Sequence, residues 1–585
     1  MHQIKRCKIK HSNSFENLSN EIIYDIFEYL NSHHVYESFF NLNQRFQNLL
    51  IRSNLPIRIH ISSITKPTFH NYINDLIKPH LNRVESIQFS NSFAAGMSTD
   101  LLLIMNNFIQ LKTLIIHDIL SVDIDRLLDA ISYLPHLTSL TIASVDEIKQ
   151  SIEFYQKIFH LPALKYFETK IEITKFDEWL PFATDRFSSI ETLILHNEIE
   201  FDEIDSLLSY VPKLRHLSLN KFKMSYRKRG QQRASTLIHL TSVCCRMSGI
   251  EFDDFKLLIH DYFTQISRLT FSNECFSNYF SQYLNADEWE QLISTTLPNL
   301  RIFNFEQQFR IWFAQIDQHI IDNYVKKFNS IFWSSRQWFF NCCYFSTSFG
   351  ELAYLYSANP YRHIFIIYNE TSNQINENMN SVKQLYIHSS EAMRTFPTCF
   401  SNVTQVTLSS RFNLKRNTFL NDFSHLISLR NLTELTLNCD RFHFEQILEL
   451  LSYSPNIHTL NLNTLPLGRT KFTVIQQTDL FRLVSNTNMI SHLTIRQLIR
   501  LKKVQLITAL CCRLECLTVN VANDDLKPII RYLLFKCEKK KRYLSSICFT
   551  KCSRFTEDIQ RVISNEQLLD NYTLNSANGK VFLWW

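Results

Sequence analysis

The side chains best suited to metal chemistry in this sequence are its 14 cysteines and 21 histidines. A structural zinc site usually needs paired cysteines, such as C-x2-C, with a second pair in register. The nearest spacings are the C-x3-C pairs that start at Cys512 and Cys548, and neither has a second pair; His33 and His34 are expected in a polar loop without a third ligand. We therefore expect no metal and no cofactor, and we interpret the cysteines as reduced thiols packed in the core.

Catalytic motifs are the next possibility. The sequence contains no H-E-x-x-H, no P-loop, no G-x-G-x-x-G and no G-x-S-x-G, and it has only six glycines in 585 residues. We therefore expect that the protein is not an enzyme and has no catalytic residues.

Composition limits the remaining classes of function. Hydrophobic residues make up 45% of the chain and charged residues 20%, which predicts a folded protein. A net charge of +6 over this length gives no general reason to expect nucleic-acid binding. Two local basic runs, 221–233 and 536–542, are interpreted as a solvated loop and a solvated helix end, with a site for an acidic partner or for nuclear import as the alternative.

The chain lacks signals for a membrane or a secretory route. No run of 18 or more apolar residues occurs, and no apolar segment follows the basic N-terminal sequence MHQIKRCKIKH. We expect no membrane partner and a cytoplasmic or nuclear location. A chain this long also requires either several domains or an array of repeats.

One short pattern recurs along the chain, as in "LKTLII" and "LTELTL": an aliphatic residue, two variable residues, and two apolar residues separated by one variable residue. Strong copies start at 111, 137, 190, 214, 266, 300, 382, 403, 432, 457, 490 and 514, and weaker copies at 84, 164 and 544. The six copies from 84 to 214 are 24 to 27 residues apart, which indicates a structural repeat. Because apolar and variable positions alternate, each copy is predicted to be a half-buried strand.

The segments between these strands have apolar residues at helical spacing, as in 123–136, 203–213 and 443–456. Several of them end in a proline, which cannot continue a helix; these are Pro135, Pro162, Pro212, Pro298 and Pro455. One strand and one helix cannot bury their own apolar faces, so neighbouring units must stack. We therefore predict an α/β fold in which a parallel sheet lines the concave side of a curved solenoid and helices cover the outside.

This pattern resembles the leucine-rich-repeat family, in its longer, helix-containing form. The resemblance covers residues 81–555. The asparagine that usually follows the strand is not placed regularly here, and residues 310–380 are irregular. We expect a distorted repeat there, with strands near 335–340 and 363–368. Residues 53–80 are predicted to connect and cap the first repeat, and residues 556–585 to cap the last one.

A separate helical segment, 15–52, precedes the repeats, and residues 1–14 are predicted to be a disordered tail. Its first helix is expected over 20–30, after Ser19 as N-cap. A second helix is expected over 35–41, and a third in "NQRFQNLL". Three short helices with this much apolar surface exceed what their own core can bury, which favours a docking surface.

The segment resembles the F-box, a motif of a leucine and a proline, then Glu-Ile, an "IFEYL"-like run, and an arginine-aromatic pair in its third helix. The matching positions are Leu18, Ser19 in place of the proline, Glu21, Ile22, Ile26, Phe27, Leu30, Arg45 and Phe46. The alternative is a helical cap that shields the first repeat.

The two resemblances together imply a substrate receptor of a cullin-RING (SCF-type) ubiquitin ligase, whose F-box docks a Skp-type adaptor that binds cullin, which in turn binds a RING protein. The implied adaptor-binding residues are Leu18, Ile22, Ile26, Phe27, Leu30 and Phe46. The alternative is a leucine-rich-repeat scaffold that binds proteins without a role in ubiquitin transfer.

The repeats would then bind an unknown protein substrate on their concave strands. The central outward position of the strands is mostly small and neutral, which strand propensity alone explains. Specificity is expected first at the charged and aromatic positions Lys170, Arg268, Glu306, Tyr386, Glu434 and Arg496. Loops are the alternative site, with the basic run 221–233 as the first candidate. The C-terminal "KVFLWW" is interpreted as covering the last repeat and not as a ligand site.

Overall fold

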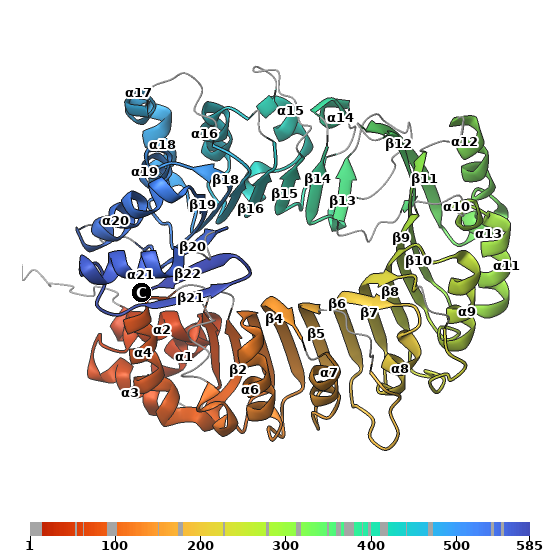
Figure 1. Ribbon diagram of the computed structural model, residues 1–585, viewed down its shortest axis with the longest axis horizontal. Helices are drawn as coiled ribbons and strands as arrows, with labels where there is room; N and C mark the ends of the chain where they lie inside the picture. Colours follow the sequence, from red (N-terminus) through yellow and green to blue (C-terminus); the bar gives the residue numbers. More distant parts are fainter. Residues whose placement is uncertain are drawn as a thin grey trace, which may run out of the picture.

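The chain folds into a ring of strands and helices in which the strands line the inner side and the helices cover the outer side (Figure 1). The computed structural model describes residues 15–52, 55–61, 64–89, 102–149, 151–173, 180–225, 229–275, 280–311, 318–347, 350–358, 364–367, 379–388, 390–395, 399–409, 419–439, 442–465, 472–539, 543–551 and 555–585. The predicted N-terminal tail, 1–14, lies outside these residues.

Two sheets form the inner wall, and within each sheet nearly all strands are parallel and follow one another in chain order. The first sheet has the order β1-β2-β3-β4-β5-β6-β7-β8-β9-β10-β12-β11: β1 (Ile57–Ile61), β2 (Val84–Phe89), β3 (Thr113–Ile119), β4 (Ser139–Ile148), β5 (Tyr166–Ile173), β6 (Thr192–Glu200), β7 (His216–Lys223), β8 (Ser242–Ser248), β9 (Arg268–Cys275), β10 (Ile302–Ile311), β11 (Phe339–Thr347) and β12 (Gly350–Ala358). The second has the order β13-β14-β15-β16-β17-β18-β19-β20-β22-β21: β13 (Ile364–Ile367), β14 (Gln384–Ile387), β15 (Gln405–Leu408), β16 (Glu434–Leu437), β17 (Thr459–Leu462), β18 (His492–Ile499), β19 (Cys516–Val521), β20 (Ser546–Thr550), β21 (Thr573–Ala577) and β22 (Lys580–Trp584).

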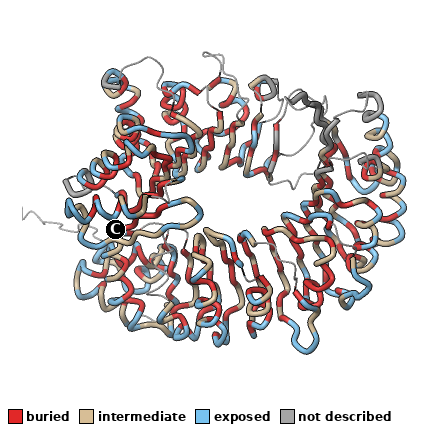
Figure 2. Tube along the Cα trace, viewed as in Figure 1, coloured by how far each residue is buried: buried red, intermediate tan, exposed pale blue. Residues whose placement is uncertain are grey.

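Helices on the outer side connect the strands, and Figure 2 shows that burial concentrates between the two layers. They are α4 (Lys66–Tyr72), α6 (Ser121–Ile131), α7 (Ser151–Phe159), α8 (Ile204–Ser209), α9 (Phe252–Tyr262), α10 (Phe280–Tyr283), α11 (Ala286–Thr296), α12 (Gln318–Lys327), α13 (Ile331–Ser335), α14 (Ser390–Thr395), α15 (Phe419–Leu426), α16 (Phe444–Tyr453), α17 (Phe472–Gln477), α18 (Asp479–Thr487), α19 (Leu501–Leu510), α20 (Asn523–Lys539) and α21 (Thr556–Asn565). The five prolines named above each lie two to four residues beyond a helix end, as expected from their inability to continue a helix.

A strand forms at each copy of the pattern that the sequence analysis names. Most begin two residues after the first aliphatic residue of the pattern: β3 begins at Thr113 after Leu111, and β16 begins at Glu434 after Leu432. That first aliphatic residue is itself buried, so it fills the core at the turn into the strand. The apolar alternation therefore predicts the mixed α/β architecture and the parallel sheets correctly.

The irregular segment 310–380 differs from the prediction. A strand near 335–340 was expected in a parallel repeat, but Ser335 ends α13 and the strand β11 begins at Phe339. β12 pairs antiparallel with both β10 and β11. Only two residues separate β11 from β12, and so short a link can join only antiparallel strands. β13, within the expected 363–368, then begins the second sheet; His363 and Tyr368 lie outside the described residues.

The N-terminal module, residues 15–52, contains the 3-10 turn η1 (Phe15–Asn17) and the helices α1 (Asn20–Tyr29), α2 (Ser32–Phe39) and α3 (Gln44–Arg52). Ser19 is the N-cap of α1 by position, although its side chain accepts no backbone hydrogen bond. The prediction of a polar loop at His33 and His34 is wrong, because Asn31 caps α2 by accepting a hydrogen bond from the His33 N–H and both histidines lie inside the helix.

The two ends of the ring meet at a joint between β22 and the segment that follows β1 (Figure 1). β22 pairs with β20, as expected of a segment that covers the last repeat, and its Leu583 packs into the core of the second sheet. Because successive strand residues face opposite sides, Phe582 and Trp584 pack into the core of the first sheet instead. The C-terminal strand is thus shared by two cores.

Hydrogen bonds complete this joint. The Trp584 indole Nε1 donates to the Ile64 carbonyl at 2.7 Å, and the Lys66 N–H donates to the Trp585 carbonyl at 3.2 Å. The ring of Trp584 also meets that of Phe69 edge-on, with the centroids 6.0 Å apart. β21 and β22 pair antiparallel as a hairpin. The tip of this hairpin reaches β4, because the Asn578 side chain donates to the Val145 carbonyl. Contacts between residues more than 400 positions apart therefore close the ring.

We predict that Trp584→Ala weakens this joint. Truncation of a buried tryptophan removes about 3 kcal/mol or more of stability, and here the loss should be local to the joint. Hydrogen exchange followed by mass spectrometry should show faster exchange in α4 and β22 than in the wild type. Tyr133→Ala, at an exposed position beyond α6, is the control and should leave both segments unchanged. Unchanged exchange in α4 of the Trp584 variant would contradict the described closure.

Candidate functional site

The six residues predicted to bind an adaptor divide into two groups. Ile22 and Leu30 are 47% and 42% exposed, and Leu18 and Ile26 are half-buried beside them. Ile22 and Ile26 lie four residues apart on one side of α1, and Leu18 and Leu30 lie just before and just after this helix. Phe27 and Phe46, in contrast, are only 7% and 0% exposed and belong to the core of the module. A docking surface on this module can therefore include the first four residues but not the two phenylalanines.

Several hydrogen bonds fix this module to the ring. The Ser32 hydroxyl, at the start of α2, donates to the Arg58 carbonyl of β1 at 2.6 Å. The side chain of Asn31, the N-cap of α2, donates to the His60 carbonyl of the same strand, also at 2.6 Å. Arg83 donates to the carbonyls of residues 50, 51 and 55 at 3.1 to 3.3 Å. The module and the first sheet also share one apolar core. The module is therefore attached through packed contacts and not through a loose linker.

The central outward residues of the strands form one row across each sheet. In the first sheet, Thr141 pairs with Glu168, Glu168 with Ile194, and Ile194 with Ser218. In the second sheet the paired residues are Tyr386, Thr407, Thr436, Asn461, Thr494, Thr518 and Cys548. The residues just before and just after each of them on the same strand point into the core. Because successive residues of a strand face opposite sides, these rows face the inner side of the ring.

The six residues predicted to contact a substrate are spread around this inner wall. Lys170 lies on β5, Arg268 on β9, and Glu306 on β10 of the first sheet, whereas Tyr386, Glu434 and Arg496 lie on alternate strands of the second. In the second sheet, Glu434 accepts a hydrogen bond from Asn461, and Arg496 donates to Asn438 at 2.9 Å. Burial raises the pKa of Glu434. The six therefore do not form one cluster.

A compact polar network does surround Glu168 on β5, and the sequence analysis did not single out this residue. The Tyr166 hydroxyl donates to the Glu168 carboxylate at 2.9 Å, and Lys170 Nζ and His196 Nε2 lie 3.4 and 3.3 Å from it. Asn220 Nδ2 lies 3.2 Å from His196 Nδ1, which suits an imidazole whose Nε2 carries the proton. Five side chains of the neighbouring strands β5, β6 and β7 are thus joined on the inner wall.

The same contacts explain two pKa shifts. The hydrogen bond from His196, helped by Tyr166 and Lys170, holds the pKa of Glu168 at about 2 despite partial burial. Burial, followed by the hydrogen bond to Glu168, raises the pKa of Tyr166 to about 12. Glu168 is therefore a fixed anion at neutral pH. The weak pattern copy at 164–169 was the sequence signal for this site, because its outward positions carry Tyr166 and Glu168.

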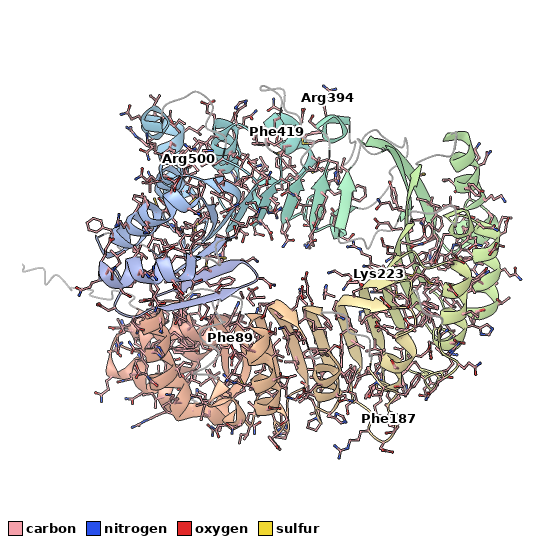
Figure 3. The ribbon with its side chains drawn as sticks, viewed as in Figure 1. Phe89, Phe187, Lys223, Arg394, Phe419 and Arg500 are labelled. Atoms are coloured by element: carbon pink, nitrogen blue, oxygen red, sulfur yellow. The ribbon has the colours of Figure 1, made fainter. Side chains whose placement is uncertain are left out.

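The basic run 221–233 is less available to a partner than the sequence predicts. Lys223 lies on β7 at the inner side of the ring (Figure 3) and pairs with Glu198. Arg229 is only 7% exposed, and its guanidinium donates to both carboxylate oxygens of Asp205 at 2.7 Å. Arg233 pairs with Asp261 at 3.1 Å. The two arginines thus tie the loop to α8 and α9; residues 226–228 lie outside the described residues.

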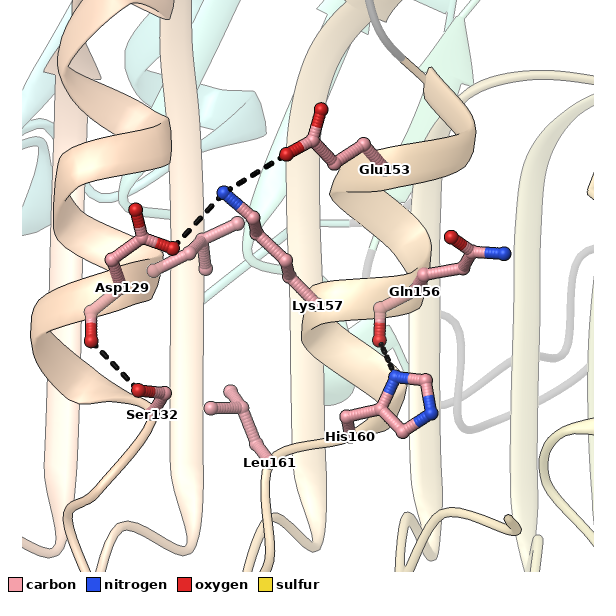
Figure 4. A pocket seen from close by; sticks show the side chains of 8 residues that line it. Asp129, Ser132, Glu153, Gln156, Lys157, His160 and Leu161 are labelled. Carbon is pink, nitrogen blue, oxygen red and sulfur yellow. Dashed lines mark hydrogen bonds and ion pairs between the residues drawn. The ribbon is translucent and has the colours of Figure 1, made fainter. Parts of the chain in front are cut away.

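A shallow hollow of about 260 Å³ lies on the outer wall between α6 and α7 (Figure 4). Lys157 Nζ lies 3.0 Å from Asp129 and 3.2 Å from Glu153, and 3.5 Å from Asp125. The carboxylates of two neighbouring helices thus surround one ammonium group. This arrangement joins the two helices, and its cation already occupies the acidic side of the hollow.

The cysteines and histidines form no metal centre in the part of the chain that is described. No group of three or more His, Cys, Asp or Glu side chains there could hold a metal ion. The nine cysteines whose side chains the structure describes are free thiols. Cys245, Cys439, Cys511, Cys516 and Cys548 are buried as expected, but Cys399 and Cys512 are exposed, which corrects the prediction that the thiols are core residues.

Comparison with known proteins gives no family assignment: neither a scan against protein-family models nor a search of curated proteins found a match. Among the described helices, none combines the length and the apolar character that a membrane crossing requires.

We predict that Glu168→Gln lowers stability at neutral pH by about 2 kcal/mol, because it removes a carboxylate whose pKa is held well below its ordinary value. A carboxyl group whose pKa is lower in the folded state than in the unfolded state stabilises the fold at every pH above its unfolded-state pKa. This stabilisation is lost as the pH falls toward the folded-state pKa of Glu168, about 2. The stability difference between the wild type and the variant, measured by denaturant unfolding, should therefore shrink from pH 5 downward. Glu172→Gln, on the same strand but exposed, should show no such trend. A difference that is constant with pH would contradict the network.

Proposed function

We propose that this protein is the substrate-recognition subunit of a cullin-RING (SCF-type) ubiquitin ligase. In this proposal the N-terminal module is an F-box that docks a Skp-type adaptor, and the strand-helix units are a leucine-rich-repeat solenoid whose inner wall binds a protein substrate. The observation that carries the proposal is the apolar row along α1, in which Ile22 and Leu30 stay exposed while Ile23, Phe27 and Phe46 form the core of the module. Exposed apolar surface of this kind is typical of protein docking.

The attachment of the module to the ring supports a positioning role. Because α2 is hydrogen-bonded to β1 and shares a core with the first sheet, an adaptor on α1 would have a fixed orientation relative to the inner wall. A substrate on that wall would be held at a high effective concentration near the conjugating enzyme. The receptor itself would supply binding and orientation, and the chemistry would occur on its partners.

The inner wall offers two kinds of surface for a protein substrate. The first sheet presents the charged network around Glu168, while the second presents hydroxyl and amide side chains with few charges. Groups that are already held by hydrogen bonds lose little conformational entropy on binding, which favours specific contact. We infer that Lys170 and His196, which flank Glu168, are better candidates for substrate contact than residues of the loop 221–233, where Arg229 and Arg233 are paired internally.

We predict that the double variant Ile22→Asp with Leu30→Asp loses adaptor binding. Both side chains are exposed in the protein alone, so the fold should survive, whereas a buried position such as Phe27 would unfold the module. Two charges on an apolar docking row should weaken binding by more than about 100-fold. The measurement is co-purification of the whole chain with a Skp-type adaptor and cullin, followed by titration calorimetry with the adaptor.

The matched control is Leu257→Asp with Ile331→Asp, which places the same two charges at exposed aliphatic positions on the outer wall. Wild type and control should bind equally. A docking variant that binds as tightly as the control would contradict the assignment of α1. If the wild type itself fails to bind, the alternative is favoured, namely a repeat scaffold in which the module caps the first strand.

A further inference from the structure

One side chain from α3, Arg45, makes several hydrogen bonds to the turn that precedes α1. The Arg45 guanidinium donates to the Leu18 carbonyl at 2.6 Å and to the Glu16 carbonyl. It also donates twice to Asn20 Oδ1, at 2.7 and 3.1 Å. A planar guanidinium carries five N–H donors in a fixed arrangement, so one arginine can hold several acceptors at once. All three acceptors lie within five residues that lead into the first turn of α1.

Two further contacts hold the same segment from the same side. The Asn43 side chain donates to the Glu16 carboxylate at 3.0 Å. The ring of Phe15 stacks on Phe39 and Phe46, with centroids 5.3 and 5.9 Å apart. The segment is therefore fastened to α2 and α3, although it is exposed to solvent on its other side.

This fastening coincides with the position where the sequence departs from the motif that it resembles. Ser19 stands where that motif has a proline, which would fix the backbone angle φ near −65°. Ser19 has a φ of −66° and a ψ of 159°, and its side chain makes no capping hydrogen bond. The conformation that proline would impose is thus present, but the residue at this position does not impose it.

The position of Arg45 beside the N-terminus of α1 does not serve to stabilise that helix through its charge. A cation near the N-terminus of a helix is unfavourable, because the backbone N–H groups there already carry partial positive charge. Arg45 compensates by donating to carbonyl oxygens just before the helix. We propose that Arg45 is a positioning residue that sets the turn before α1, and so holds Leu18 in line with Ile22, Ile26 and Leu30 as one docking row. The proposal rests on the docking role of α1 described above.

The test compares four variants of the full chain: Arg45→Ala, Arg45→Lys, Arg45→Ala with Ser19→Pro, and the control Arg52→Ala, an exposed arginine on the same helix. Arg45→Ala should weaken adaptor binding about tenfold, since Leu18 loses its fixed place. Arg45→Lys should recover little, because an ammonium cannot hold three acceptors in a planar arrangement. Adding Ser19→Pro should restore most of the affinity, because proline fixes the same φ. Arg52→Ala should bind like the wild type.

A second readout does not depend on the adaptor. Amide hydrogen exchange of residues 15–20 in the protein alone should become faster in Arg45→Ala and return toward the wild-type rate with Ser19→Pro. Unchanged exchange in Arg45→Ala would overturn the positioning role whatever the binding result. If binding stays weak when Ser19→Pro has restored the exchange rate, Arg45 contacts the partner directly and the proposal is also overturned. If the wild type does not bind the adaptor but the exchange rates change as stated, the docking role fails while the control of the turn by Arg45 stands.

Discussion

The structure depends on one constraint: each strand has one apolar face that a single strand-helix unit cannot bury. Stacking is the only way to cover this face, and from 84 to 214 the repeat length of 24 to 27 residues gives each unit enough chain for one strand and its outer segment. Parallel order, inner strands and outer helices all follow from it. The last parallel strand of each sheet has an open edge, and the chain covers it with an antiparallel hairpin, β11–β12 beside β10 and β21–β22 beside β20.

The second hairpin does more than cover an end. Because β22 has Leu583 in one core and Trp584 in the other, it joins the last units to the segment that carries the N-terminal module. The module is held by β1 through α2, and the C-terminal strand holds the segment after β1 through Ile64 and Phe69. Its orientation relative to the inner wall becomes a property of the whole ring, and this is the property that a positioning role requires.

Local pattern predicts the parallel strands because burial of alternate residues is encoded within six positions. It fails at β8, whose copy "LTSVCC" has a cysteine at the last apolar position of the pattern. It also fails at β11 and β12, because a repeat count assumes parallel order. The F-box resemblance also implies Phe27 and Phe46 as docking residues, but both are buried in the core of the module, and apolar character alone does not separate a core side chain from an exposed one. The joint at Trp584 and the network around His196 involve residues from different units, so only the assembled structure reveals them.

The central claim is that the exposed row on α1 docks a partner while the inner wall stays available for a substrate. The most direct measurement is hydrogen exchange of the full chain, alone and in complex with a Skp-type adaptor bound to cullin. The account predicts that protection on binding is confined to α1 and the turn before it, and that the inner-wall strands from β3 to β9 exchange as they do in the protein alone. Protection of those strands with no change in α1 would contradict it.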